Sequence, residues 1–177
     1  MSTLSSALLI LRPLTVDDVN NVHQLHLLPQ TDKYNTLGIP ESIHQTEMLM
    51  QEWFQLIKQK EKYIFCIEDK EQNFAGLIGM NIGKARYQKA EIWYKINYNQ
   101  WGKGFATEAV KMILSFGFND LKLHRIEAGC VTENTASVKV LEKCGFIKEG
   151  IRRKNLPIRG EWKDNYEFAI LEEEYGV

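Results

Sequence analysis

A glycine-rich turn in the second half of the chain joins a strand-like segment directly to a helix-like segment. In residues 90–97 apolar and polar side chains alternate, which predicts a strand. Gly102-Lys103-Gly104 follows, and a helix is predicted from about residue 104 to residue 119. Glycines let successive backbone N–H groups face one concave side, and the first N–H groups of a helix lack internal partners. We therefore predict an anion site suited to a phosphate, with Lys103 adding positive charge.

Two known phosphate-binding motifs fit this turn poorly. A P-loop has its lysine directly after the second glycine of Gly-x-x-x-x-Gly-Lys, and that spacing is absent. A dinucleotide-binding fingerprint would need glycine or alanine at the position of Thr107, within a strand-helix-strand unit near the start of the domain. A tight turn without any ligand is the remaining alternative to the anion site.

The segments around the turn predict a mixed α/β fold. The predicted strands are residues 8–11, 63–68, 74–83, 90–97, 125–131, 146–153 and 162–171. Helices are predicted after Thr15, from Ser42, from about residue 104, and over 134–144 with Gly145 ending the last one. Residues 31–40 predict an irregular loop. We expect one domain over residues 1–177, with a mostly antiparallel sheet of about seven strands flanked by about four helices.

Composition narrows the possible partners and compartment. The formal net charge of −1 gives no reason to expect nucleic acid or a membrane surface as a partner. The chain has an odd number of cysteines, and all three lie in apolar settings: Cys66, Cys130 and Cys144. We therefore expect their thiols to be reduced and to pack in the interior. His23 and His26 share a helix face without a visible third ligand, and we expect no metal site. The apolar run 7–11 is too short to span a membrane, which favours a cytoplasmic protein.

Seven segments occur in a recognisable order over nearly the whole chain. They are Leu11-Arg12-Pro13-Leu14 with Asp17-Asp18, residues 75–79, residues 90–94, residues 101–109, residues 123–128, residues 133–146 and Gly160-x-Trp162-x-Asp164. Together they resemble the GNAT superfamily of N-acetyltransferases, and more closely its branch typified by ribosomal-protein N-terminal acetyltransferases. Any one segment alone is weak evidence for the family, but all seven in this order are specific to it.

The resemblance implies that acetyl-CoA binds where two parallel strands, 91–97 and 125–131, splay apart. Strand backbone at Tyr94, Lys95 and Ile96 would then bond the pantetheine arm. The pyrophosphate would be held by backbone N–H groups of Trp101, Gly102, Lys103, Gly104, Phe105, Ala106 and Thr107. The family usually begins this signature with Gln or Arg, and we expect the change to Trp101 to be tolerated. Asn134 would bond the pantetheine, a role compatible with a plain helix N-cap.

Acetyl transfer to an amine needs a base, a polarised carbonyl and a proton for the leaving thiolate. A backbone N–H near Ile96 is the expected oxyanion donor. Many relatives use a tyrosine as acid where this chain has Leu141, so that assignment fails, and Ser137 is the candidate acid. The alternative for Ser137 is an ordinary helix-surface serine. Glu91 is our first choice as general base, although it sits at the start of its strand.

The predicted function is acetyl transfer from acetyl-CoA to a primary amine by direct attack in a ternary complex. The acceptor is a protein N-terminus or a small amine such as a polyamine, an amino acid or an amine antibiotic. Its site should be formed by the first helices and the loops 31–40 and 155–160. The alternative is an acetyl-CoA-binding module with little or no catalysis, motivated by the missing tyrosine. A monomer or a homodimer is expected.

Overall fold

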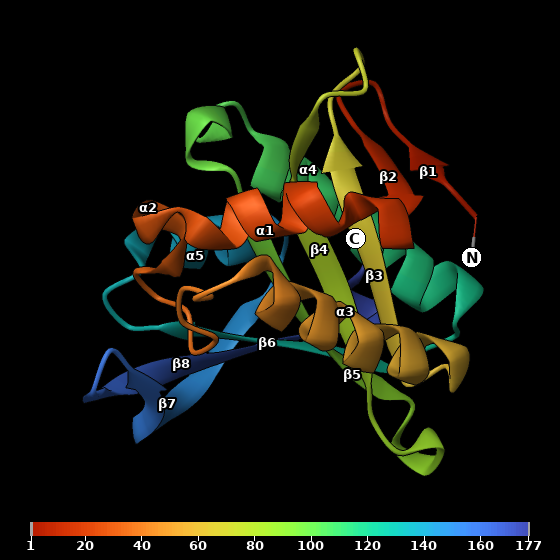
Figure 1. Ribbon diagram of the computed structural model, residues 1–177. Helices are drawn as coiled ribbons and strands as arrows, with labels where there is room; N and C mark the ends of the chain where they lie inside the picture. Colours follow the sequence, from red (N-terminus) through yellow and green to blue (C-terminus); the bar gives the residue numbers. More distant parts are fainter. Residues whose placement is uncertain (1, 177) are drawn as a thin grey trace.

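One mixed sheet of eight strands organises the fold (Figure 1), and the computed structural model describes residues 2–176. The strands follow the order β1-β2-β3-β4-β5-β6-β8-β7. Every neighbouring pair is antiparallel except β5 and β6, which are parallel. The strands are β1 (Leu4–Ser5), β2 (Ile10–Pro13), β3 (Lys62–Glu68), β4 (Phe74–Ile82), β5 (Lys89–Ile96), β6 (Arg125–Val131), β7 (Ile147–Ile158) and β8 (Glu161–Leu171). The prediction of a mixed, mostly antiparallel sheet is confirmed.

Helices cover both faces of this sheet. They are α1 (Val19–Leu27), α2 (Pro29–Asp32), α3 (Ile43–Lys58), α4 (Phe105–Ser115) and α5 (Thr135–Lys143). Helices α1 and α3 lie across one face and α4 packs on the other (Figure 1). Helix α3 begins where the sequence predicted, and the Ser42 side chain caps it by accepting a hydrogen bond from the Gln45 amide. Gly145 follows α5 with a φ of +88°, the left-handed conformation expected at that position.

Two separate apolar clusters result from these layers. The smaller cluster joins α1 and α3 to the sheet, with Val22, Leu25 and Trp53 packed against strand residues such as Ile64. The larger cluster packs α4 against the opposite face, where Ile113 and other α4 residues are fully buried. Because the central strands are covered on both sides, β3 and β4 are buried almost continuously instead of alternating.

The structure corrects several predicted boundaries. Strand β1 has only two residues, too few for a sequence pattern, and it adds an eighth strand to the expected seven. Helix α2 overlaps the start of the predicted loop at 31–40 and begins with Pro29 in its first turn. Strand β7 continues to Ile158, through two irregularities in its register with β8, so the predicted loop at 155–160 is mostly strand.

The predicted helix over 104–119 changes type partway along. Helix α4 ends at Ser115, and residues 116–120 form a π-helical turn. Gly117 lies in this turn, where an added Cβ would come within 2.6 Å of Ile126 Cδ1 and 2.9 Å of Met80 Cε. The lack of a side chain at Gly117 therefore allows the turn to pack directly on the sheet.

A partly buried ion-pair network joins β2 to the residue that precedes α1. Arg12 on β2 contacts both carboxylate oxygens of Asp18, at 2.6 and 2.8 Å, and its Nε donates to Glu68 at 2.7 Å. Asp18 also accepts hydrogen bonds from the backbone and hydroxyl of Thr15. Burial alone would raise the pKa of Asp18, but the hydrogen bonds from Arg12 and Thr15 outweigh it and lower the pKa to about 2. The network sets the direction in which the chain enters α1.

Replacing Asp18 with Asn should lower the free energy of unfolding by about 2 kcal/mol at pH 7. A carboxylate with a lowered pKa stabilises the fold above about pH 4, and this contribution is lost as the pH falls from 4 towards 2. Urea unfolding of both proteins should therefore converge at low pH. The exposed neighbour Asp17 provides the control, because Asp17→Asn should change stability by less than about 0.5 kcal/mol. A difference that persists unchanged at pH 2 would contradict the assignment.

Candidate active site

The two parallel strands separate partway along their length. Strands β5 and β6 pair from Lys89 opposite Arg125 to Ile92 opposite Ala128, and no pair follows in the described structure. Beyond that point β5 stays bonded to β4 as far as Ile96, while β6 stays bonded to β8 as far as Val131. The expected splay between strands 91–97 and 125–131 is thereby confirmed.

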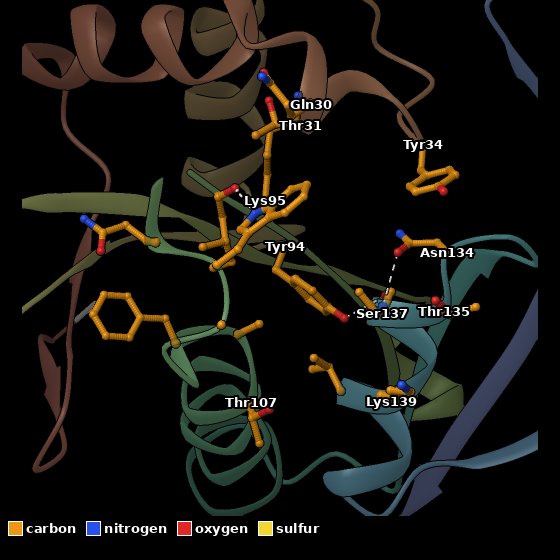
Figure 2. Close-up of a pocket in the computed structure, with 18 of the residues that line it drawn as sticks. Gln30, Thr31, Tyr34, Tyr94, Lys95, Thr107, Asn134, Thr135, Ser137 and Lys139 are labelled. Atoms are coloured by element: carbon orange, nitrogen blue, oxygen red, sulfur yellow. Dashed lines mark hydrogen bonds between the residues drawn. The ribbon is translucent and has the colours of Figure 1, made fainter. Parts of the chain in front are cut away.

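A cavity of about 580 Å³ lies at this splay, and four parts of the chain line it (Figure 2). The contributing parts are the end of β5, the turn that leads into α4, helix α5 with the residues before it, and helix α2. The lining residues used below are Gln30, Thr31, Lys33, Tyr34, Tyr94, Lys95, Ile96, Trp101, Gly102, Gly104, Phe105, Ala106, Thr107, Glu133, Asn134, Ser137, Lys139 and Lys143. Segments that are far apart in the sequence thus share one space.

The structure brings all but two of the predicted site residues to this cavity. Lys103 is not among its lining residues; its exposed ammonium group donates to Gln100 Oε1 at 2.7 Å. Glu91 lies in the part of β5 that still pairs with β6, opposite Glu127. Glu91 is exposed by its surface area, but desolvation by neighbouring residues, followed by the charge of Glu127, raises the pKa of its carboxyl. Tyr94 is three positions further along β5, about 10 Å away.

The glycines of the turn are required by backbone conformation. Gly102 has a φ of +78° and Gly104 a φ of +82°, values that favour glycine. A Cβ at Gly102 would meet nothing within 4 Å, and one at Gly104 would meet only Leu8 Cδ2 at 4.0 Å, so the space beside them is open. Gly104 is the N-cap of α4, and no side chain caps this helix. The first N–H groups of α4 and the positive end of its dipole are therefore available to an anion.

Trp101 fastens this turn to the end of β5. Its indole Nε1 donates to the carbonyl of Ile96 at 2.9 Å, and its ring packs edge-on against Tyr98 at 5.3 Å. The amide of Asn97 bonds Ala75 on β4, so by strand alternation the backbone of Ile96 faces the gap. The Ile96 carbonyl thus accepts a hydrogen bond from within the chain, and the binding of the pantetheine arm by strand backbone at residues 94–96 stays a prediction. The amide of Ile96 is the backbone donor at this point of the gap.

Tyr94 and Ser137 connect β5 to α5 across the cavity. Their hydroxyl oxygens are 2.7 Å apart, and both side chains line the cavity (Figure 2). Burial raises the pKa of the Tyr94 phenol above its usual value, partly offset by the hydrogen bond with Ser137. The side chain of Asn134 accepts from the Ser137 amide at 3.2 Å and so caps α5. Leu141 is 1% exposed within the apolar core, so it contributes no group to the cavity.

The other end of the cavity is formed by α2 and by the side chain of Lys95. The sequence pointed to Lys95 for its backbone alone, yet its side chain is 6% exposed and its Nζ has no hydrogen-bond partner among the described residues. Burial lowers the pKa of Lys95 to about 8, although Asp32 nearby opposes the shift. Arg159, in the turn between β7 and β8, bonds Asp32 and the carbonyl of Pro29. The segment 155–160 therefore holds α2 in place without lining the cavity.

Four residues line the α2 side of the cavity: Gln30, Thr31, Lys33 and Tyr34. The sequence indicated them only through the general prediction that the first helices and the loop 31–40 form the acceptor site. Their sequence carries no recognisable motif, and a one-turn helix leaves no periodic signal. All three cysteines are buried. Within residues 2–176 the structure contains no helix long and apolar enough to cross a membrane. The same residues bring together no group of three His, Cys, Asp or Glu side chains suited to hold a metal ion.

Removing the buried charge of Lys95 should stabilise the fold. Below pH 8 the ammonium is charged in both states and its burial cost is fully present; the cost fades as the pH rises from 8 towards 10.5. Lys95→Met should therefore raise the free energy of unfolding by about 3 kcal/mol at pH 7, with a smaller gain at pH 10. The exposed residue Lys58 serves as control, since Lys58→Met should show no such pH dependence. Lower stability of Lys95→Met at pH 7 would contradict this picture.

Comparisons with known proteins agree with this geometry. Residues 9–147 match the acetyltransferase (GNAT) domain family. An uncharacterised N-acetyltransferase of Bacillus licheniformis is 35% identical over 176 residues, which cover 99% of both chains. A GNAT-family acetyltransferase structure from Bacillus anthracis superposes with a TM-score of 0.85 at 31% identity, covering 97% of this chain and 99% of the other.

A second solved structure is similar over nearly the whole chain. Spermidine N-acetyltransferase from Vibrio cholerae, solved in complex with CoA and spermine, has a TM-score of 0.87 to this chain at 28% identity. The match covers 96% of this chain and 99% of that protein. The matched domain, the near full-length relative and the splayed parallel strands lead to one conclusion: this chain belongs to the GNAT family of acetyltransferases and is an acyltransferase enzyme.

Proposed function

We propose that this protein transfers an acetyl group from acetyl-CoA to a primary amine by direct attack in a ternary complex. The single observation that carries the proposal is one continuous cavity. It extends from the N-terminus of α4, through the gap between β5 and β6, to α2. Such a space holds two ligands that meet at the gap, and proximity of that kind supplies much of the acceleration in group transfer. The CoA and spermine complex of the Vibrio cholerae relative supports this arrangement.

The residues at the α4 end fit the phosphates of CoA. Gly102 and Gly104 leave open space beside the turn, and the uncapped amides of α4 point to an anion site. Lys139 and Lys143 on α5 add positive charge to the facing wall. Asn134 uses its side-chain oxygen for the helix cap, which leaves its NH₂ group as a donor to the pantetheine arm. Acetyl-CoA, when bound, supplies an acetyl group activated as a thioester.

At the gap, the chain provides donors for the two atoms that gain negative charge. The Ile96 amide is the proposed donor to the acetyl carbonyl oxygen. Tyr94 and Ser137 share a hydrogen bond, and one of these hydroxyls donates to the leaving sulfur while the other supports it. Glu91 lies outside the cavity. It stays our prediction for the general base, with a water molecule relaying the proton from the amine to its carboxylate.

The acceptor is a protein N-terminus or a small-molecule amine, and the ribosomal-protein branch stays a prediction. We further propose a single domain that works in the cytoplasm as a monomer or a homodimer. The burial of Leu141, where many relatives have a catalytic tyrosine, keeps a second function in view: a module that binds acetyl-CoA with little catalysis. Turnover separates the two, because both require cofactor binding.

Acetyl-CoA should stabilise the folded protein. At about one hundred times its dissociation constant it adds roughly 2.7 kcal/mol to the free energy of unfolding, which a thermal shift detects. Gly104→Ala should weaken this stabilisation, because Gly104 lines the cavity and the added methyl group would occupy open space beside the turn. Gly160→Ala is a matched control: Gly160 also has a positive φ and open surroundings but lies outside the cavity, so it shares the backbone strain alone. No shift at millimolar acetyl-CoA would refute the proposed function.

Removing the Tyr94 hydroxyl should slow the reaction without weakening cofactor binding. We expect Tyr94→Phe to lower kcat by at least about tenfold, and Ser137→Ala by a smaller factor, in an assay of thiol release with a panel of amines and peptides. Tyr87→Phe is the control, since that exposed hydroxyl lies outside the cavity. Cofactor binding without thiol release from any amine would instead favour the binding module.

A further inference from the structure

An ammonium group without a partner is buried at the α2 end of the cavity. Lys95 is more than nine-tenths buried, and its Nζ meets no hydrogen-bond acceptor among the described residues. Figure 2 shows Lys95 between the α2 residues Gln30 and Thr31 and the strand residue Tyr94. A buried charge is unfavourable unless it is paired. An unpaired charge in the wall of a binding cavity indicates that its partner comes from outside the chain.

The surrounding groups leave an excess of positive charge. Burial, followed by the charges of Lys95 and His23, lowers the pKa of His26 on α1 to about 3, so His26 is neutral at pH 7. Asp32 on α2 carries the nearby negative charge; its Oδ2 pairs with Arg159 at 3.2 Å, whereas its buried Oδ1 has no hydrogen-bond partner among the described residues. Two cations, Lys95 and Arg159, thus lie near a single carboxylate, and of the two only Arg159 makes a hydrogen bond to it. Lys33 adds a third cation to the α2 side of the cavity.

The alternation of β5 assigns its two neighbouring side chains to different ligands. Tyr94 bonds Ser137 on the α5 side of the sheet, where the thiol of CoA would lie. Lys95 is on the opposite face, with its charge beneath α2 and near Asp32. The group next to Lys95 therefore belongs to the acceptor and not to the cofactor.

We propose that the acceptor carries a carboxylate close to its reacting amine, as an α-amino acid does, and that Lys95 binds this carboxylate. The inference rests on the proposed function and names its substrate class. A hydrogen bond between an ammonium and a carboxylate is short and charge-assisted, so it provides the partner that Lys95 lacks. A polyamine, by contrast, brings additional positive charge towards Lys33 and Lys95, which repel it.

The test compares each amino acid with its own carboxamide, in which a neutral amide replaces the α-carboxylate. We would measure kcat/KM by thiol release at pH 7 for alanine, phenylalanine and glutamate, for their carboxamides and for spermidine. In Lys95→Met the ratio of acid to amide should fall at least about tenfold, mainly through KM. The values for the amides should change by less than about twofold. Because each ratio is compared between two proteins, the different basicities of the amines cancel.

Three results would overturn the proposal: an acid-to-amide ratio equal in both proteins, a preference of the wild-type protein for spermidine, or an equal loss for every amine. The last would identify Lys95 as a general base instead. The control variant Lys58→Met, at an exposed site outside the cavity, should leave all values unchanged. The expected gain in stability of Lys95→Met guards against loss of folding as an explanation.

Binding without acetyl-CoA separates the two proposals. Millimolar amino acids should raise the melting temperature of the wild-type protein but not that of Lys95→Met. If amino acids stabilise the wild-type protein selectively while acetyl-CoA neither binds nor is consumed, the carboxylate site stands and the proposed function fails. If acetyl-CoA is consumed with amides or spermidine while amino acids neither bind nor react, the carboxylate site is refuted and the proposed function stands.

Discussion

The site depends on a break in hydrogen bonding between two adjacent parallel strands. Strands β5 and β6 pair as far as Ile92 and Ala128 and then diverge, although each stays bonded to its other neighbour. The antiparallel partners β4 and β8 keep the diverging ends extended, so backbone groups of the Ile96 region face a gap instead of another strand. Those groups need partners. Trp101 satisfies one of them from within the chain, and the rest are available to a ligand.

The edges of the gap differ chemically. At one end lie the uncapped start of α4 and the open glycine turn, where the proposed anion site depends on backbone groups and Trp101 bonds the end of β5. At the other end side chains decide the chemistry, because Lys95 and Lys33 leave the α2 side positively charged. In the proposed function, cofactor binding thus depends on the backbone of the fold, whereas acceptor choice depends on a few side chains.

The sequence predicted local structure well wherever a residue type favours one particular backbone conformation. The strand 125–131 matches β6 throughout, Ser42 caps its helix, and Gly102 and Gly104 adopt the positive φ values that their turn requires. Signals were weak where a segment is short or depends on distant contacts. The one-turn helix α2 relies on Arg159 from the far end of the chain, and the two-residue strand β1 exists through its pairing with β2.

By itself, the sequence determined the class of fold and the glycine turn that leads into α4, because alternation, helix caps and glycines act over a few neighbouring positions. It also indicated Tyr94, Asn134 and Ser137 as neighbours of one cavity, through family resemblance. The tertiary structure alone decided that Glu91 lies outside the cavity and that Lys95 is buried beside α2 without a partner. Burial and charge balance depend on what packs against a side chain, and for Lys95 the nearby charge of Asp32 comes from a segment more than sixty residues earlier in the chain.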